Sequence, residues 1–245
     1  MSPVTIVTGG SRGIGAATAR LCGDHGHAVC IVYRNEAEKA REIAGAIEGA
    51  GGRAIAVQAD TAVEADILRL FETVDRELGA PTGLVNNAGI HGPRARLEEL
   101  TADDIESVLQ VNVAGYFLCA REAVKRMSTK HGGKGGSIVN VSSGSAYIGS
   151  PGEGILYGAS KGAVNTLTIG LAQEVAREGI RVNTVSPGLT APGMPPPEKV
   201  EEIGPKLPMG RAGRPEEIAE SIYWLLTDKA SYTSGANIRV SGGRP

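Results

Sequence analysis

Residues 8–15 read Thr8-Gly9-Gly10-Ser11-Arg12-Gly13-Ile14-Gly15, between the apolar run Val4–Val7 and a helical pattern. Gly9 allows a tight turn, Gly13 lets backbone approach a phosphate group, and Gly15 lets helix and strand pack closely. A pyrophosphate would lie at the helix N-terminus, where free N–H groups and the helix dipole favour anions. The stretch therefore predicts a dinucleotide site, with a glycine-rich structural turn as the alternative. A P-loop is not favoured, because no Lys-Ser or Lys-Thr pair closes the motif.

Short apolar runs alternate with helix-period segments along the rest of the chain. We expect strands at Val4–Val7, Ala28–Val32, Ala54–Val57, Gly83–Val85, Ser137–Val141, Ile180–Val185 and Asn237–Val240. Several of these runs are apolar throughout, which is typical of strands buried on both faces of a parallel sheet. Repeated βα units of this length predict an α/β fold with a doubly wound sheet, and no linker divides residues 1–245 into separate domains.

Glycine accounts for 35 of the 245 residues, about twice its ordinary usage. Part of this excess is expected to end helices in the left-handed conformation, at Gly23, Gly26, Gly51, Gly79 and Gly179. The Pro- and Gly-rich stretch 188–215 has no clear period. A segment of that length within a compact domain is typical of a lid or binding loop, and an ordered surface excursion is the alternative.

The composition excludes several classes of protein. A net charge of −2, from 25 basic and 27 acidic residues, indicates no nucleic-acid or membrane partner. No apolar run approaches the ~18 residues that are needed to span a bilayer. The first apolar stretch also lacks the preceding basic region that is typical of a signal peptide. The three cysteines and four histidines lack metal-ligand spacing, so we expect no metal site. These features predict a cytoplasmic protein whose cysteines are buried in a reducing compartment.

The end of the second expected strand bears on the choice of dinucleotide. An NAD site usually has an acidic residue here for the ribose 2′-hydroxyl, but this chain has Val32-Tyr33-Arg34-Asn35. A guanidinium at Arg34, joined by Arg12 from the glycine loop, can bind a 2′-phosphate. We therefore expect NADP(H) in preference to NAD(H). The alternative is that Arg34 is a solvated charge before the next helix.

Polar residues follow the next two strands as well. Asp60 can accept a hydrogen bond from an adenine amino group, and Asn86-Asn87-Ala88-Gly89 offers amide donors and close backbone approach beside a ribose. Each is a common loop residue, but successive strand ends meet at one edge of a doubly wound sheet.

The residues expected to carry chemistry lie in the second half of the chain. Tyr157 and Lys161 are four residues apart and share one face if this segment is helical. The ammonium of Lys161 would lower the pKa of Tyr157 from about 10 towards the neutral range that acid–base catalysis needs. A serine after the fifth strand can orient a substrate oxygen. Asn112 is polar within an apolar helical pattern, which indicates a buried partner or an ordered water.

These motifs, in this order and over Val4 to Gly243, resemble the short-chain dehydrogenase/reductase family, and particularly its glucose 1-dehydrogenase-like and 3-oxoacyl-carrier-protein reductase-like members. The resemblance implies a Rossmann fold with seven strands, hydride transfer between NADP(H) and a carbonyl or secondary alcohol, and a homotetramer or homodimer. It implies Tyr157 as general acid, Lys161 as the residue that lowers its pKa and binds the nicotinamide ribose, and Asn112 as holder of a relay water. The implied cofactor-binding residues are Gly9, Ser11, Arg12, Gly13, Ile14, Gly15, Arg34, Asn35, Asp60, Thr61, Asn87, Ala88, Gly89, Tyr157, Lys161, Pro187, Gly188 and Thr190.

Two positions depart from the family pattern. Thirteen residues separate Ser143 from Tyr157, where many relatives have twelve. We assign the substrate-orienting serine to Ser143, with Ser142 and Ser145 as alternatives. Pro192 stands where many relatives have a threonine, so the contact to the nicotinamide carboxamide is expected at Thr190.

Two other functions remain as rivals. Gly158-Ala159-Ser160-Lys161-Gly162 matches the G-x-S-x-G pattern of α/β-hydrolases, but no strand is expected before Ser160 and every histidine precedes it. The stronger alternative is a sensor or scaffold that binds NADP without turnover. The substrate remains open, with Arg94 and Arg96 as candidate contacts for an acid.

Overall fold

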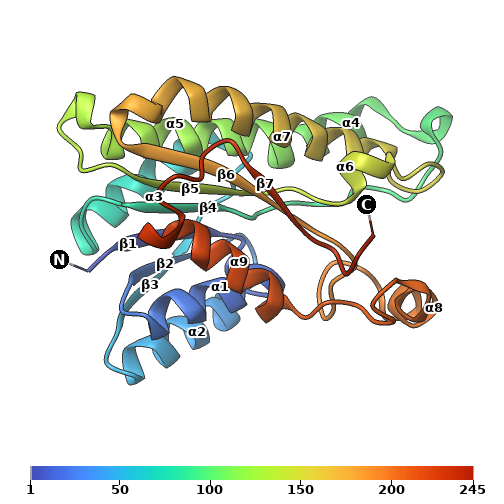
Figure 1. Cartoon of the computed structure of the whole chain (residues 1–245), viewed down its shortest axis with the longest axis horizontal. Helices are drawn as coiled ribbons and strands as arrows, with labels where there is room; N and C mark the ends of the chain where they lie inside the picture. The colour runs from blue at the N-terminus through green and yellow to red at the C-terminus, as the bar shows by residue number, and fades with distance from the viewer. Residues whose placement is uncertain (1, 245) are drawn as a thin grey trace.

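The computed structural model describes residues 2–244 and contains one seven-stranded parallel sheet between two layers of helices (Figure 1). Every strand begins and ends within two residues of the expected apolar run, so the predicted sheet is confirmed. The strands are β1 (Val4–Thr8), β2 (Ala28–Tyr33), β3 (Arg53–Gln58), β4 (Gly83–Asn86), β5 (Gly136–Val141), β6 (Ile180–Pro187) and β7 (Asn237–Val240).

The strand order is β3-β2-β1-β4-β5-β6-β7. Val7 of β1 pairs with Ile31 of β2 on one side and with Val85 of β4 on the other. The connections leave β1 and β4 in opposite directions, so a crevice forms between the loops at the carboxyl ends of these two strands. The fold therefore places its ligand-binding position next to the glycine-rich stretch.

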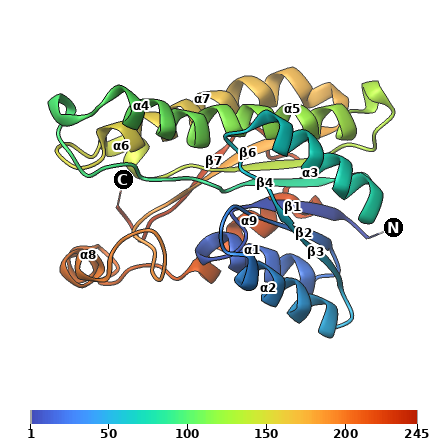
Figure 2. The ribbon, with the colours of Figure 1, turned by 180° about the vertical axis from the view of Figure 1, so that it is seen from behind.

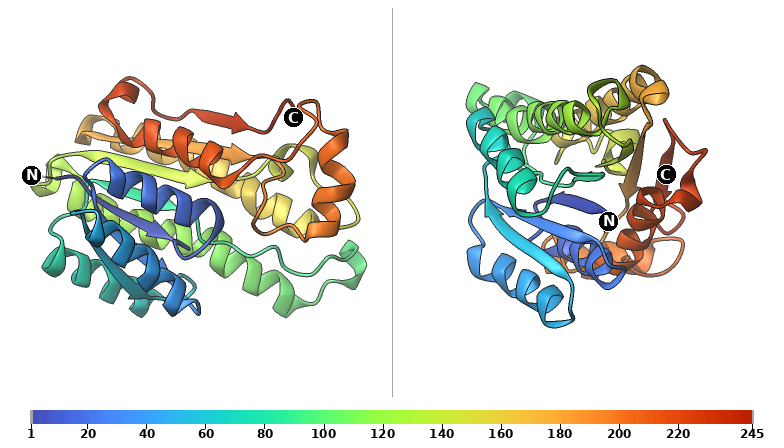
Figure 3. Two further views of the ribbon diagram at one scale, coloured as in Figure 1. Left: turned by 90° about the horizontal axis from the view of Figure 1, so that it is seen from below. Right: turned by 90° about the vertical axis from the view of Figure 1, so that its left-hand side faces the viewer.

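The helices form two layers on opposite faces of the sheet, seen end-on in Figure 3. Ile31 and Ile222 belong to the apolar core beneath one layer, and Phe71 and Met127 belong to the core beneath the other. The first layer consists of α1 (Gly13–Asp24), α2 (Ala37–Gly49) and α9 (Pro215–Leu226). The second consists of α3 (Glu64–Glu77), α4 (Ala102–Leu109), α5 (Gly115–Met127), the short α6 (Ser145–Ile148) and α7 (Ile155–Val175).

A π-helical turn, Gln110–Ala114, joins α4 to α5 and carries Asn112. Such turns inside helices are frequent at functional sites. Asn112 is fully buried here, which agrees with its expected interior position.

Four of the five glycines expected to end helices have positive φ angles and lie just beyond a helix, namely Gly26, Gly51, Gly79 and Gly179. The prediction for Gly23 is wrong, because it lies within α1. A Cβ added at Gly23 would lie 2.7 Å from Cγ1 of Ile47, so this glycine allows α1 and α2 to pack closely.

The stretch 188–215 contains a helix that the sequence did not predict. Figure 2 shows this helix, α8 (Pro197–Ile203), beyond the carboxyl edge of the sheet. A parallel bridge between Thr190 and Gly213 closes the base of the excursion. Seven residues are too few for a helical period to be distinguished in the sequence. Within residues 2–244, no helix has the length and apolar composition to cross a bilayer.

Candidate active site

A cavity of about 750 Å³ opens at the carboxyl edge of the sheet and extends from the glycine loop to α7 and α8. It brings together residues from almost the whole length of the chain. The wall includes every residue expected in the site except Gly15 and Asn112, that is Gly9, Ser11, Arg12, Gly13, Ile14, Arg34, Asn35, Asp60, Thr61, Asn87, Ala88, Gly89, Ser143, Tyr157, Lys161, Pro187, Gly188 and Thr190.

The glycine loop has the conformation that an anion site requires. Gly9 and Gly13 adopt φ angles of +62° and +53°, which side-chain-bearing residues rarely adopt. A Cβ on Gly15 would collide with the carbonyl oxygen of Gly9. No side chain caps the N-terminus of α1, and its first turn carries no acidic residue. The N–H groups there are free for a diphosphate, so the loop fits the expected cofactor.

Asn87 braces this loop from the neighbouring strand. Its side-chain Nδ2 donates to the carbonyl oxygens of Thr8 (2.9 Å) and Gly9 (3.1 Å). The Thr8 hydroxyl accepts from the backbone N–H groups of Asn87 and Ala88. The Nδ2 group of Asn87 is therefore engaged by the loop, while the residue itself lines the cavity. The backbone of Ala88 and Gly89 still lines the cavity.

Two arginines lie at the outer end of the cavity. Nη1 of Arg34 lies 3.6 Å from Oδ2 of Asp60, while Oδ1 of Asp60 accepts from the N–H of Ala62. Both carboxylate oxygens of Asp60 thus have partners within the chain, and its main observed role is to position Arg34. Arg12 lies near Glu36, whose pKa is lowered first by a hydrogen bond from Lys39 and further by the Arg12 charge. No motif in the sequence distinguishes Glu36 as a site residue.

Ser143 and Tyr157 meet at the inner end of the cavity. Burial raises the pKa of Tyr157 above its ordinary value, and a hydrogen bond with Ser143 opposes this increase. Ser142 is buried, and its hydroxyl donates to the carbonyl oxygen of Lys161 (3.0 Å). The N–H of Ser145 donates to the Ser143 hydroxyl (3.1 Å). Of the three serines considered, Ser143 is the one that contacts the tyrosine.

Lys161 is buried beside Tyr157 but bonds to other residues. Its Nζ donates to the carbonyl oxygen of Val141 (2.8 Å) and to the hydroxyl of Tyr116 (3.0 Å). Nζ lies 5.9 Å from the ring centroid of Tyr157. Burial lowers the pKa of Lys161 to about 7. Tyr116 is not predicted from the sequence, because a tyrosine in the apolar pattern of a helix has no signal that distinguishes it from a core residue.

Asn112 lies behind the cavity wall. Its Nδ2 donates to the carbonyl oxygen of Ile90 (2.8 Å) and to the hydroxyl of Ser160 (3.0 Å), and its Oδ1 accepts from the N–H of Ile90 (2.9 Å). A Cβ on Gly89 would lie 3.2 Å from Oδ1 of Asn112 and 3.5 Å from Nζ of Lys161. The buried partner expected for Asn112 is therefore the loop after β4.

Ser160 does not have the position of a catalytic nucleophile. It is fully buried within α7, and its hydroxyl donates to the carbonyl oxygen of Tyr157 (2.7 Å). A nucleophile elbow would place it exposed at the end of a strand.

The substrate end of the cavity has an aromatic wall. The ring of His91 stacks on that of Tyr157, with centroids 5.0 Å apart and planes 19° from parallel. Burial is the main cause that lowers the pKa of His91. Arg94 lines the cavity, whereas Arg96 lies outside the wall and bonds Glu98. The rest of this end is mainly aliphatic, with Ile148, Leu189, Met194 and Ile203.

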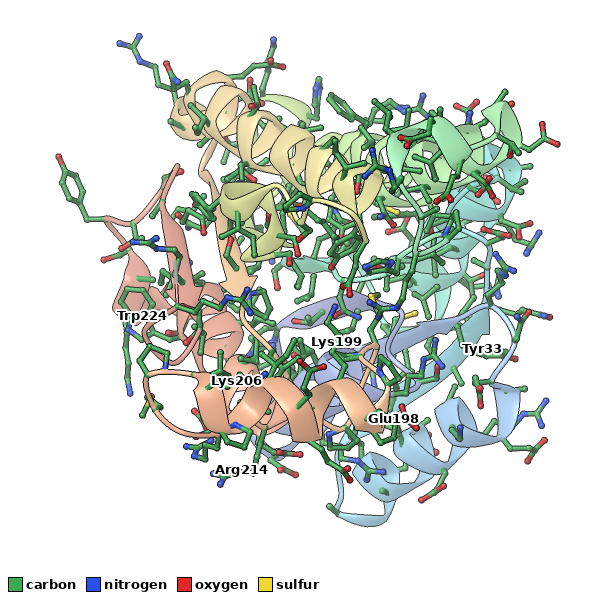
Figure 4. All side chains as sticks on the ribbon, turned by 90° about the vertical axis from the view of Figure 1, so that its right-hand side faces the viewer. Tyr33, Glu198, Lys199, Lys206, Arg214 and Trp224 are labelled. Atoms are coloured by element: carbon green, nitrogen blue, oxygen red, sulfur yellow. The ribbon has the colours of Figure 1, made fainter. Side chains whose placement is uncertain are left out.

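Three charged residues connect the segments around the cavity mouth. Oε2 of Glu153 lies 3.4 Å from Nη1 of Arg94 and also pairs with Nζ of Lys199. Lys199 belongs to α8, and Figure 4, which looks onto this helix, shows it on the side toward the sheet. Glu153 therefore links α8 to the loops that follow β4 and α6. Within residues 2–244, no group of three or more His, Cys, Asp or Glu side chains is arranged to hold a metal ion.

Known proteins are similar to this chain over nearly its whole length. A family model described as enoyl-(acyl carrier protein) reductase matches residues 9–244. The chain is 48% identical over 245 residues to the oxidoreductase YgfF of Escherichia coli (strain K12), covering 98% of this chain and 99% of that protein. It is 37% identical over 242 residues to glucose 1-dehydrogenase 2 of Bacillus subtilis (strain 168), covering 97% and 93%. A crystal structure of a short chain dehydrogenase from Burkholderia cenocepacia J2315 in complex with NADP is similar with a TM-score of 0.92 at 33% identity, covering 99% and 97%.

Proposed function

Since the chain belongs to the short-chain dehydrogenase/reductase family, whose members are oxidoreductases of CH–OH and C=O groups, we propose that it transfers hydride between NADP(H) and a small carbonyl compound or secondary alcohol. One observation carries the proposal. A single cavity has an uncapped helix N-terminus and two arginines at one end, and the hydrogen-bonded pair Ser143 and Tyr157 at the other.

The cofactor would be held along the length of this cavity. The glycine loop and the N-terminus of α1 would bind the pyrophosphate, and Arg12 and Arg34 would bind the 2′-phosphate. Lys161 and the backbone of Thr190 would contact the nicotinamide end. When bound, the reduced cofactor supplies the hydride. The solved structure in complex with NADP supports this assignment, because it has the same fold over 97% of its length.

Tyr157 would act as general acid in reduction and as general base in oxidation. Its hydroxyl proton goes to the carbonyl oxygen as that oxygen gains negative charge, and Ser143 orients the same oxygen. A positively charged Lys161 stabilises the phenolate that remains. Asn112 would hold the relay water through its main chain, because its side-chain atoms are already bonded to Ile90 and Ser160.

The remaining proposals concern the whole molecule. Residues 1–245 would form one oxidoreductase domain, and residues 188–215 would serve as a lid over the substrate end of the cavity. Support for the lid comes from α8, which borders the cavity with Lys199 and Ile203. We also propose a cytoplasmic homotetramer or homodimer, as expected for this family.

The experiment measures NADPH oxidation with a panel of small aldehydes, ketones, diketones and sugars, for the wild type and for Tyr157→Phe. Fluorescence titration shows whether each protein still binds NADPH. We expect turnover of at least one class of carbonyl compound, and a loss of roughly 10²–10⁴-fold in Tyr157→Phe with NADPH affinity retained. Undiminished turnover in the variant would refute the assigned acid. Tight NADPH binding without turnover of any compound would favour the sensor or scaffold.

A further inference from the structure

Tyr116 is a fully buried tyrosine whose hydroxyl lies behind the active site. It is located on α5, is 1% exposed, and donates a hydrogen bond to the carbonyl oxygen of Val141 at the end of β5 (3.0 Å). The same carbonyl accepts from Nζ of Lys161 (2.8 Å), and that Nζ also donates to the Tyr116 hydroxyl (3.0 Å). These three groups form a closed triangle of hydrogen bonds.

This arrangement determines which protons of Tyr116 and Lys161 are already used in hydrogen bonds. A phenol has one proton, and that of Tyr116 is engaged by Val141, so its oxygen can only accept from Lys161. An ammonium has three protons, and two of those on Lys161 are engaged here. Within residues 2–244 the third has no hydrogen-bonding acceptor, and Nζ lies 4.7 Å from the ring centroid of Tyr116 and 5.9 Å from that of Tyr157.

The surroundings of Lys161 contain no counter-charge among the described residues. Burial alone lowers its pKa, with no carboxylate acting on it. The titratable groups packed near it are Tyr116 and Tyr157, with Cys119 beside Tyr116 and His91 stacked on Tyr157. Burial raises the pKa of Tyr116 well above 10 and that of Cys119 to about 12, so both are neutral at physiological pH. Dipoles, and not an ion pair, must therefore stabilise the buried ammonium.

We infer that Tyr116 is a positioning residue for Lys161: its hydroxyl accepts a hydrogen bond from the ammonium, favours the charged form, and leaves one N–H free towards the cavity. Val141 and Tyr116 hold two protons on the sheet side, so the free proton is available to the catalytic tyrosine and to a bound ribose. This inference rests on the proposed function for its catalytic consequence, but the hydrogen-bonding role itself can be tested in the protein without cofactor.

The first experiment measures the pKa of Lys161 directly. In protein labelled with ¹³C at the lysine side chains, the Cε signal absent from Lys161→Met identifies this residue, and its shift is followed from pH 5.5 to 10. Tyr116→Phe removes only the hydroxyl, and Val141 keeps its bond from Lys161, so no buried acceptor loses its last donor. We expect the pKa of Lys161 to fall by about one unit, because a hydrogen-bond acceptor that favours the charged form is lost. An unchanged or increased pKa would overturn the inference.

The second experiment separates positioning from structural support. Tyr223→Phe removes a hydroxyl on α9, outside the cavity wall, and serves as the matched control. We expect Tyr116→Phe to shift the pH midpoint of alcohol oxidation upward by about half to one unit and to weaken NADPH binding several-fold, while the control changes neither. The lower charge on Lys161 makes the Tyr157 phenolate less stable, which gives the direction of the shift. In a Lys161→Met background, Tyr116→Phe should have no further effect on NADPH affinity. A decrease in thermal stability with an unchanged midpoint and affinity would show that Tyr116 is only structural.

Discussion

The carboxylate of Asp60 lies 3.6 Å from the guanidinium of Arg34, so the loop after β3 contacts the first side chain beyond β2. Both side chains are partly exposed, which limits the energy of this pair to well under 1 kcal/mol. Its importance is geometric, because it holds a cation over the outer end of the cavity. The pair gives Asp60 a role beside the adenine contact expected from the sequence, which stays a prediction.

Arg34→Asp should reverse the preference for the phosphorylated cofactor. We expect NADPH affinity to fall by about 10- to 100-fold, since a charge-assisted hydrogen bond contributes roughly 1.5–3 kcal/mol, while NADH affinity changes little or increases. Fluorescence titration of both cofactors measures this. Arg41→Asp, a charge reversal on the exposed face of α2, is the control and should have no effect. Equal affinity of the wild type for NADPH and NADH would reject the 2′-phosphate site.

Ser143→Ala should impair catalysis more than Ser145→Ala. Loss of the Ser143 hydroxyl removes the hydrogen bond that opposes the raised pKa of Tyr157, so this pKa increases further. We expect kcat/KM to fall by roughly 10- to 100-fold and the pH midpoint of alcohol oxidation to rise, with Ser145→Ala close to wild type. Steady-state kinetics across pH measures both effects. A larger defect in Ser145→Ala would move the substrate-orienting role to that residue.

The free energy of unfolding should depend on pH through Lys161. Its pKa is about 7 in the folded protein and about 10.4 in an unfolded chain, so between these values the unfolded state binds more protons. The stability of the wild type relative to Lys161→Met should therefore rise with pH from 7 to 8.5, by at most about 1.4 kcal/mol per pH unit. Below pH 6 the difference in the free energy of unfolding between the wild type and Lys161→Met should not change with pH. Urea unfolding at several pH values measures this, with Lys229→Met on the surface as control. Parallel curves for wild type and Lys161→Met would contradict the low pKa.

Glu153→Gln should change substrate preference at the cavity mouth. The glutamate neutralises part of the positive charge of Arg94 and Lys199, both of which line the cavity. Removing its charge should raise kcat/KM for carboxylate-bearing carbonyl compounds about 2- to 5-fold relative to neutral ones, because exposed ion pairs contribute about 0.2–1 kcal/mol. Glu198→Gln removes the same charge from a residue of α8 outside the cavity wall, and should leave the ratio unchanged. An unchanged ratio in Glu153→Gln would show that these cations do not contact the substrate.

Much of the fold could be predicted because its signals are local. A strand buried on both faces is an apolar run, as in β1 and β2, and all seven expected segments are strands of the sheet. The prediction for 188–215 missed α8, whose seven residues are too few to show a period. The sequence wrongly predicts a helix end at Gly23, because the contact of this glycine with Ile47, 24 residues later, leaves no trace in the adjacent sequence.

By itself, the sequence determined the parallel sheet, the glycine loop and the spacing of Tyr157 and Lys161, because backbone sterics and helical geometry act over a few residues. Only the tertiary structure decided that Ser143 contacts Tyr157, that Asp60 holds Arg34, and that Tyr116 accepts from Lys161 45 residues away. Those contacts join different elements across the edge of the sheet. They depend on how side chains are aimed when helices and strands pack, and hydrogen bonds of about 3 Å tolerate little error in that packing.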